Sequence, residues 1–112
     1  METAEIERLD QIAAQVSVFL DEQLGESATD VETYLTNKTV AISAANCLSP
    51  GELSLVQMVE DWKLLQEAKA RQFEKVKHLL QQRIKNVTGC DVPFIHSVVG
   101  QDGKRFVFVT LG

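Results

Sequence analysis

Residues that interrupt helices are scarce in this sequence. Proline occurs twice and glycine six times among 112 residues, and neither occurs between Glu52 and Thr88. Nothing in that stretch removes a backbone N–H or frees the backbone in the way these two residues do. The stretch can therefore be helical throughout, and the rest of the chain is organised around it.

The sequence also lacks a surplus of positive charge and a long hydrophobic run. Its formal net charge is −5 and its pI is about 4.9. General binding to nucleic acid needs basic surface, so we expect no nucleic-acid partner. No apolar run reaches the roughly 18 residues of a membrane span, so we expect no direct membrane insertion. The first ten residues lack the pattern of a signal peptide, which favours a cytoplasmic location.

Catalytic and metal-binding motifs are lacking too. Cys47 and Cys90 flank the long stretch and are expected to be reduced thiols. There is no Cys-x-x-Cys, no phosphate-binding glycine loop and no His-Glu-x-x-His. His78 and His96 lie in different predicted elements, and a zinc site needs about four converging ligands. We therefore predict no catalytic residue, no cofactor and no metal site, and hence no enzyme.

The boundaries of the long stretch are typical of a helix. Ser49 suits an N-cap, Pro50 the first helical position, and Glu52 completes a capping box. Gly89 can take the left-handed conformation that ends a helix. These signals predict one helix from about Pro50 to Thr88, roughly 58 Å long if straight.

The other segments alternate between two periodicities. Apolar residues from Ile6 to Leu20 recur at helical spacing and stop before Gly25, which predicts an amphipathic helix. Residues 31–36 and 39–45 alternate with a period of two and form a predicted hairpin, as do residues 92–99 and 104–111. We predict a single α+β domain over residues 1–112. It is a two-layer sandwich in the order α-β-β-α-β-β, with an antiparallel four-stranded sheet, one short helix and one very long helix.

The predicted helix is longer than the predicted strands. If the helix were straight, the two hairpins would start at its opposite ends, too far apart to pair fully. Either the helix breaks near Ala68 or a second chain completes the sheet. The helix-forming residues around Ala68 favour a continuous helix and a homodimer. The expected dimer interface is the apolar stripe Leu55, Trp62, Leu65, Phe73, Val76 and Leu80.

The last predicted strand is apolar on both faces. Phe106 and Phe108 share one face, and Val107, Val109 and Leu111 share the other. One layer of helices covers only one face of a sheet, so something else is expected to cover the second.

Four segments resemble the MpsC-like family, which is named after a sodium-translocating, membrane-potential-generating system. They are the Thr-Tyr strand at residues 31–35, the Leu-Ser-Pro-Gly-Glu helix start at 48–52, the Thr-Gly helix end at 87–92 and the apolar strand at 106–111. The resemblance covers nearly the whole chain. It implies an accessory of membrane machinery that moves cations or inorganic carbon.

Two hypotheses for function follow. The first is a non-enzymatic, cytoplasmic, dimeric interaction or regulatory module, with a protein partner in a membrane transport system, as the resemblance implies. The alternative is a small-ligand sensor whose pocket lies at the helix–sheet or dimer junction, near Tyr34, His96 and Arg105.

Overall fold

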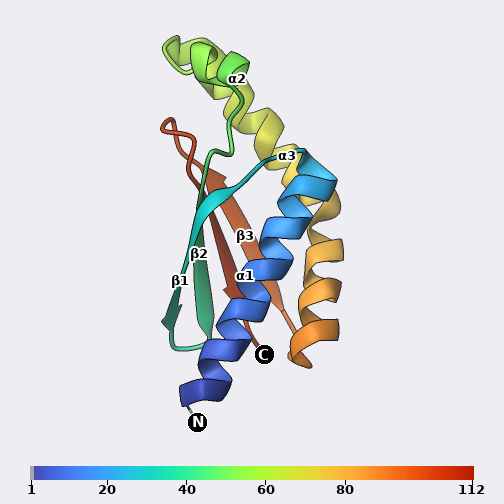
Figure 1. The fold of residues 1–112 in the computed structure, drawn as a ribbon. Coiled ribbons are helices and arrows are strands. Elements are labelled where there is room, and N and C mark those ends of the chain that lie inside the picture. Colours follow the sequence, from blue (N-terminus) through green and yellow to red (C-terminus); the bar gives the residue numbers. More distant parts are fainter. Residues whose placement is uncertain (1) are drawn as a thin grey trace.

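The computed structural model describes residues 2–112. Helix α1 (Glu2–Leu24) leads into strands β1 (Thr29–Thr36) and β2 (Thr39–Ala45), which form a hairpin. A short helix α2 (Pro50–Leu55) and a long helix α3 (Val59–Thr88) follow, and strands β3 (Phe94–Val99) and β4 (Arg105–Thr110) form a second hairpin. This confirms the predicted α+β class and the α-β-β-α-β-β order, with the second helix divided into α2 and α3 (Figure 1).

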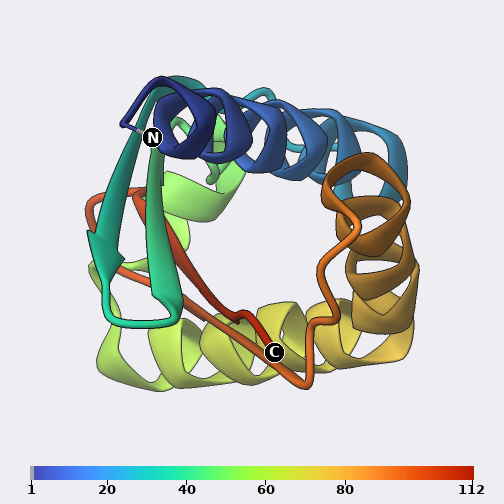
Figure 2. The same cartoon turned by 90° about the horizontal axis from the view of Figure 1, so that it is seen from below.

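The four strands form one antiparallel sheet in the order β1-β2-β4-β3. The last strand therefore lies inside the sheet, between β2 and β3. Helices α1 and α3 pack on the same face, which Figure 2 shows from below. That face and the two helices share one core, formed by Ile12, Val16, Phe19, Leu20, Val40, Ile42, Ala44, Phe73, Leu80, Ile84, Val107 and Val109, with further residues at its margin.

The predicted ends of the helices are confirmed. The Ser49 hydroxyl accepts a hydrogen bond from the backbone N–H of Glu52, whose carboxylate accepts one from the N–H of Ser49. Gly89 ends α3 with φ 74° and donates its N–H to the carbonyl of Lys85, and Gly25 follows α1 with φ 65°. These local signals depend on few residues, so the sequence specifies them without tertiary help.

The prediction of one continuous helix from Pro50 to Thr88 is wrong. The helix ends at Leu55 and restarts at Val59, and Met58 has an extended backbone with φ −103° and ψ 119°. The reversal brings Lys69 Nζ within 3.0 Å of the Glu52 carboxylate. On a straight helix those residues would be separated by 17 positions, or about 25 Å. The long-range ion pair thus accompanies a turn at residues 56–58, which contains neither glycine nor proline.

No break occurs near Ala68, because α3 runs uninterrupted through it. The two hairpins nevertheless pair within one chain, with Ile42 of β2 opposite Val107 of β4. Both hairpins can pair in one sheet because the helices extend past the end of that sheet. A 30-residue helix spans about 45 Å, whereas the strands span roughly 20–26 Å. Helix α2, the turn and the first part of α3 project beyond one end of the sheet (Figure 1). We call this projection, residues 50–68, the overhang.

Candidate functional site

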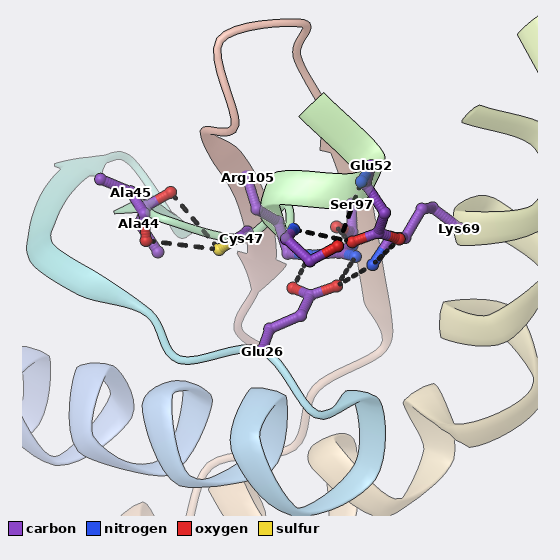
Figure 3. A network of polar contacts seen from close by, with 9 residues as sticks. Glu26, Ala44, Ala45, Cys47, Glu52, Lys69, Ser97 and Arg105 are labelled. Atoms are coloured by element: carbon purple, nitrogen blue, oxygen red, sulfur yellow. Dashed lines mark hydrogen bonds and ion pairs between the residues drawn. The ribbon is translucent and has the colours of Figure 1, made fainter. Parts of the chain in front are cut away.

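A network of charged side chains lies where the overhang joins the sheet (Figure 3). Its centre is Glu26, which follows α1 and is almost fully buried. The carboxylate accepts hydrogen bonds from Arg105 Nε at 2.8 Å and Arg105 Nη2 at 2.7 Å. It also accepts one from Lys69 Nζ at 3.2 Å. One carboxylate therefore joins the α1–β1 connection, the start of β4 and the middle of α3.

Arg105 is the largest buried charged group, with 1 % of its surface exposed. Besides its two bonds to Glu26, it donates from Nη1 to the hydroxyl of Ser97 on β3 at 2.6 Å. Its guanidinium lies 5.7 Å from the ring centroid of Phe73 on α3, within the range of a cation–π contact. A planar, permanently charged group with several donors suits such a buried position better than lysine would.

Glu52 extends the network into α2. Its carboxylate lies 3.0 Å from Lys69 Nζ and also accepts the N–H of Ser49. Partial burial by itself would raise the pKa of Glu52, but the hydrogen bonds from Ser49 and Lys69 and the charge of Lys69 outweigh it, so the pKa is lowered. The negative charge on Glu52 is therefore favoured in the folded protein.

The network is internally balanced. Two cations, Lys69 and Arg105, face two carboxylates, Glu26 and Glu52. Among the described residues, no buried side-chain nitrogen or oxygen lacks a hydrogen-bond partner. A set of charges whose hydrogen bonds are all made within the protein holds secondary-structure elements together. A binding or catalytic site instead presents polar groups that still lack a hydrogen-bond partner. Its chemistry therefore supports a structural joint between the overhang and the sheet.

A pocket of about 380 Å³ opens beside the network. Glu26, Asn46, Glu52, Lys69 and Gln72 supply its polar lining, and Cys47 also borders it. Burial, followed by the negative charge of Glu26, raises the pKa of the Cys47 thiol to about 11. Cys47 is thus a protonated, buried thiol rather than a nucleophile. The described residues include no group of three or more histidine, cysteine or acidic side chains placed to hold a metal ion.

The three residues of the sequence-based ligand pocket do not meet. Arg105 points into the core, whereas Tyr34 and His96 lie on the opposite face of the sheet, on edge strands β1 and β3. The Tyr34 hydroxyl instead donates to Glu32 at 2.5 Å. The hydrogen bond with this carboxylate, and then its charge, raise the pKa of Tyr34.

Sequence reasoning missed Glu26 and Lys69. Glu26 sits in a polar connection and carries no pattern of its own. Lys69 did carry a signal, because it falls between Leu65 and Phe73 at intervals of four on the apolar stripe. A charged residue in phase with a buried stripe indicates a buried ion pair, although its partner is not visible in the sequence.

The predicted dimer stripe divides between two environments. Phe73 and Leu80 are buried in the chain's own core, and Val76 packs against that core. Trp62 and Leu65 are half-buried and Leu55 is exposed, and all three belong to the overhang. The stripe therefore serves first to attach α3 to the sheet.

The overhang carries the largest share of exposed apolar side chains on the helices. Val59 is 76 % exposed, Leu64 65 % and Met58 61 %, and Leu53 and Leu55 are each about 40 % exposed. Most exposed apolar side chains are scattered singly, whereas these five lie within twelve consecutive residues. We call these five residues of the overhang, Leu53, Leu55, Met58, Val59 and Leu64, the apolar tip.

The comparison with known families concerns the whole of this fold. The family model described as "Na+-translocating membrane potential-generating system (MpsC)" matches residues 4–110. The chain is a member of the MpsC family. No curated protein and no solved structure matches it. Within residues 2–112, the chain has no helix that is both long and apolar enough to cross a membrane.

The motifs that resembled the family mark ends and pairings of elements. In this MpsC chain, residues 31–35 lie in β1 and residues 48–52 form the capped start of α2. Residues 87–92 contain the glycine end of α3, and residues 106–111 contain most of β4. The motifs therefore specify the architecture. The charged network of Glu26, Glu52, Lys69 and Arg105, called the joint below, and the apolar tip lie outside most of these motifs and are the candidate functional features.

Proposed function

We propose that this MpsC protein is a non-enzymatic accessory of a sodium-translocating, membrane-potential-generating system. In this proposal it is a cytoplasmic module that contacts a membrane subunit of that system through the apolar tip of the overhang. The process in this proposal, sodium translocation that generates a membrane potential, comes from the family. The contact surface comes from the exposed apolar residues of this chain.

One observation carries the proposal. Met58, Val59 and Leu64 leave most of their side-chain surface in water at the end of a projection that the sheet does not support. Exposed apolar residues grouped on a rigid projection are typical of protein contact sites. The buried joint supports the same use, because it fixes the overhang to the sheet and so reduces the entropy lost on binding.

The charges next to the tip favour a protein partner over a lipid surface. Glu60 and Asp61 follow Val59 directly, and only Lys63 offsets them nearby. Anionic lipid headgroups would repel these two carboxylates, because the charges have the same sign. Helices that bind a membrane surface normally carry lysine and arginine instead. A protein surface with an apolar depression and a basic rim complements this tip.

A non-enzymatic role agrees with the chemistry of the described residues. The buried charges are paired with one another, and Cys47 is held as a neutral thiol.

The experiment measures membrane potential in cells that encode this chain. We expect deletion of the gene to reduce the sodium-dependent component of the potential, and the wild-type chain to restore it. The variant Val59→Asp with Leu64→Asp should fold but fail to restore it. Leu79→Asp, an exposed leucine of α3 outside the overhang, is the matched control and should restore it. Full restoration by the double variant would contradict the proposal.

A second candidate function is a small-ligand sensor, favoured by the pocket of about 380 Å³ whose polar lining includes Glu26, Asn46 and Gln72. Ligands that bind only the folded state raise the melting temperature. A thermal-shift screen with nucleotides and carboxylates tests this reading. Gln72→Trp should fill the pocket and abolish any genuine shift. No shift at millimolar ligand would exclude ligands of these classes.

A further inference from the structure

The outer face of the sheet, opposite the helices, is left uncovered within the chain. The strand register places its side chains in three rows. The first row is Thr36, Thr39, Thr110 and Phe94; the second is Tyr34, Ala41, Phe108 and His96; the third is Glu32, Ser43, Phe106 and Val98. Only one of these twelve residues, Glu32, carries a formal charge at neutral pH. A sheet face that meets water normally carries several charged residues, whereas this face is nearly uncharged and includes three phenylalanines, Phe94, Phe106 and Phe108.

The apolar residues of the outer face adjoin one another. Phe106 and Phe108 stack on β4 with ring centroids 6.5 Å apart. Beside them on β3, Phe94 is 59 % exposed and Val98 is 43 % exposed. With Tyr34, the exposed aromatic surface alone is on the order of 300 Å², given about 200 Å² for an aromatic side chain. The largest apolar patch on a monomeric protein typically has about this size and often has a function.

We propose that a second copy of this chain covers the outer face, with the two sheets packed face to face around a two-fold axis parallel to the strands. Two-fold dimers are the commonest oligomers, and each copy then offers the same surface. Facing sheets pack about 10 Å apart with side chains from both filling the layer. The stacked Phe106 and Phe108 lie on an inner strand, β4, and so near the middle of the interface.

The polar residues of this face support that orientation. The only carboxylate, Glu32, lies on edge strand β1, and the only imidazole, His96, lies on the opposite edge strand, β3. An axis parallel to the strands places β1 of one copy over β3 of the other. Because this rotation keeps each row at its own height, Tyr34 of each copy comes opposite His96 of its partner and Glu32 opposite Val98. Glu32 and His96 are then diagonal neighbours, and the imidazole N–H can donate to the carboxylate. The contact occurs twice, at both rims.

The area of the face fits a reversible dimer. Four strands about 4.8 Å apart, with six residues rising about 3.3 Å each, cover roughly 19 by 20 Å. Two copies thus bury roughly 760 Å² in flat projection, which is below the range of stable interfaces and is typical of a weak, transient dimer. The mass should therefore depend on concentration. The inference goes beyond the proposed function, since it uses neither the overhang nor the transport system.

The first experiment is sedimentation equilibrium over a range of concentrations. We expect the mass to rise from 12.5 kDa toward twice that value as the concentration increases. Phe106→Glu should abolish the rise, because it places a charge at the centre of the interface. Leu79→Glu is the matched control, a similarly exposed residue on α3, and should leave the rise unchanged. Far-UV circular dichroism verifies folding, and Val98→Glu on edge strand β3 replaces Phe106→Glu if the latter does not fold.

The second experiment exchanges the polar rim residues. Glu32→Lys should raise the dissociation constant about five- to tenfold, because lysine then lies diagonal to His96 and both rims lose their hydrogen bond. The double variant Glu32→Lys with His96→Glu should restore the wild-type constant. Loss without rescue overturns the strand-parallel axis. A chain that stays monomeric at every concentration, or a dimer that tolerates both Phe106→Glu and Val98→Glu, overturns the inference altogether.

Discussion

Glu26 binds the guanidinium of Arg105 through two hydrogen bonds, although the residues are separated by 79 positions. Glu26 is the only buried carboxylate among the residues that the structure describes, and Lys69 shares it. The pair therefore attaches the end of α1 to the sheet, and Lys69 attaches α3 and, through Glu52, α2. The position of the overhang depends on this contact.

Removal of the shared carboxylate should be strongly destabilising. Glu26→Ala leaves Arg105 and Lys69 buried without their common partner, a situation that typically costs about 3–5 kcal/mol. Urea denaturation measures the loss of unfolding free energy. The control is Glu22→Ala, which removes the ion pair with Arg83 near the surface and should cost less than about 1 kcal/mol. Similar losses in both variants would contradict the assigned role of the joint.

Replacement of the whole buried set should be less harmful than removal of one member. In the triple variant Glu26→Leu, Lys69→Leu, Arg105→Met, no buried charge is left unpaired, and apolar packing offsets part of the loss. We expect the triple variant to unfold at a higher urea concentration than Glu26→Ala. A triple variant that is less stable than the single one would indicate that the hydrogen bonds matter more than desolvation of the charges.

Glu52 should contribute to the loss of stability in acid. Its pKa in the folded protein is lowered from the ordinary value of 4.5, so its contribution is complete above about pH 5 and is lost as the pH falls through the lowered pKa. Glu52→Gln keeps a capping box but removes the charge. The free energy of unfolding, measured against pH, should therefore show a wild-type advantage at neutral pH that disappears in acid. A constant difference at all pH values would contradict the assignment.

The two thiols should differ in reactivity. The pKa of Cys47 is raised to about 11 and its side chain is buried, so little thiolate exists at pH 8. Cys90 is only partly buried. Iodoacetamide at pH 8 should therefore alkylate Cys90 first, and Cys47 only when urea unfolds the chain, as peptide mass spectrometry would show. Faster labelling of Cys47 in the folded protein would overturn this placement.

The fold was predictable where structure depends on local pattern. The capping box at Ser49, the left-handed Gly89 and the alternation in the four strands specify their elements with only a few neighbouring residues. The turn at residues 56–58 was not predictable in this way. It contains neither glycine nor proline, and the contact that accompanies it joins Glu52 to Lys69 across space. Tertiary contacts outweighed helix propensity there.

The candidate site was less predictable than the fold. Arg105 was singled out from the sequence, but with Tyr34 and His96, which the sheet places on the other face. Strand alternation fixes which residues of one strand share a face, and the face that each strand turns to the core depends on its partners. Glu26 was not predicted at all, because a residue in a connection has no periodicity to mark it.

The most direct test of the proposed function is photo-crosslinking from the apolar tip. A photoreactive phenylalanine analogue at Met58, in cells that encode the chain, should crosslink to a membrane-embedded subunit of the sodium-translocating system. The same analogue at Glu74, an exposed position of α3 outside the overhang, should not. That pattern is the result we predict. Crosslinks to such a subunit from Glu74 and none from Met58 would contradict the claim that the overhang is the contact surface.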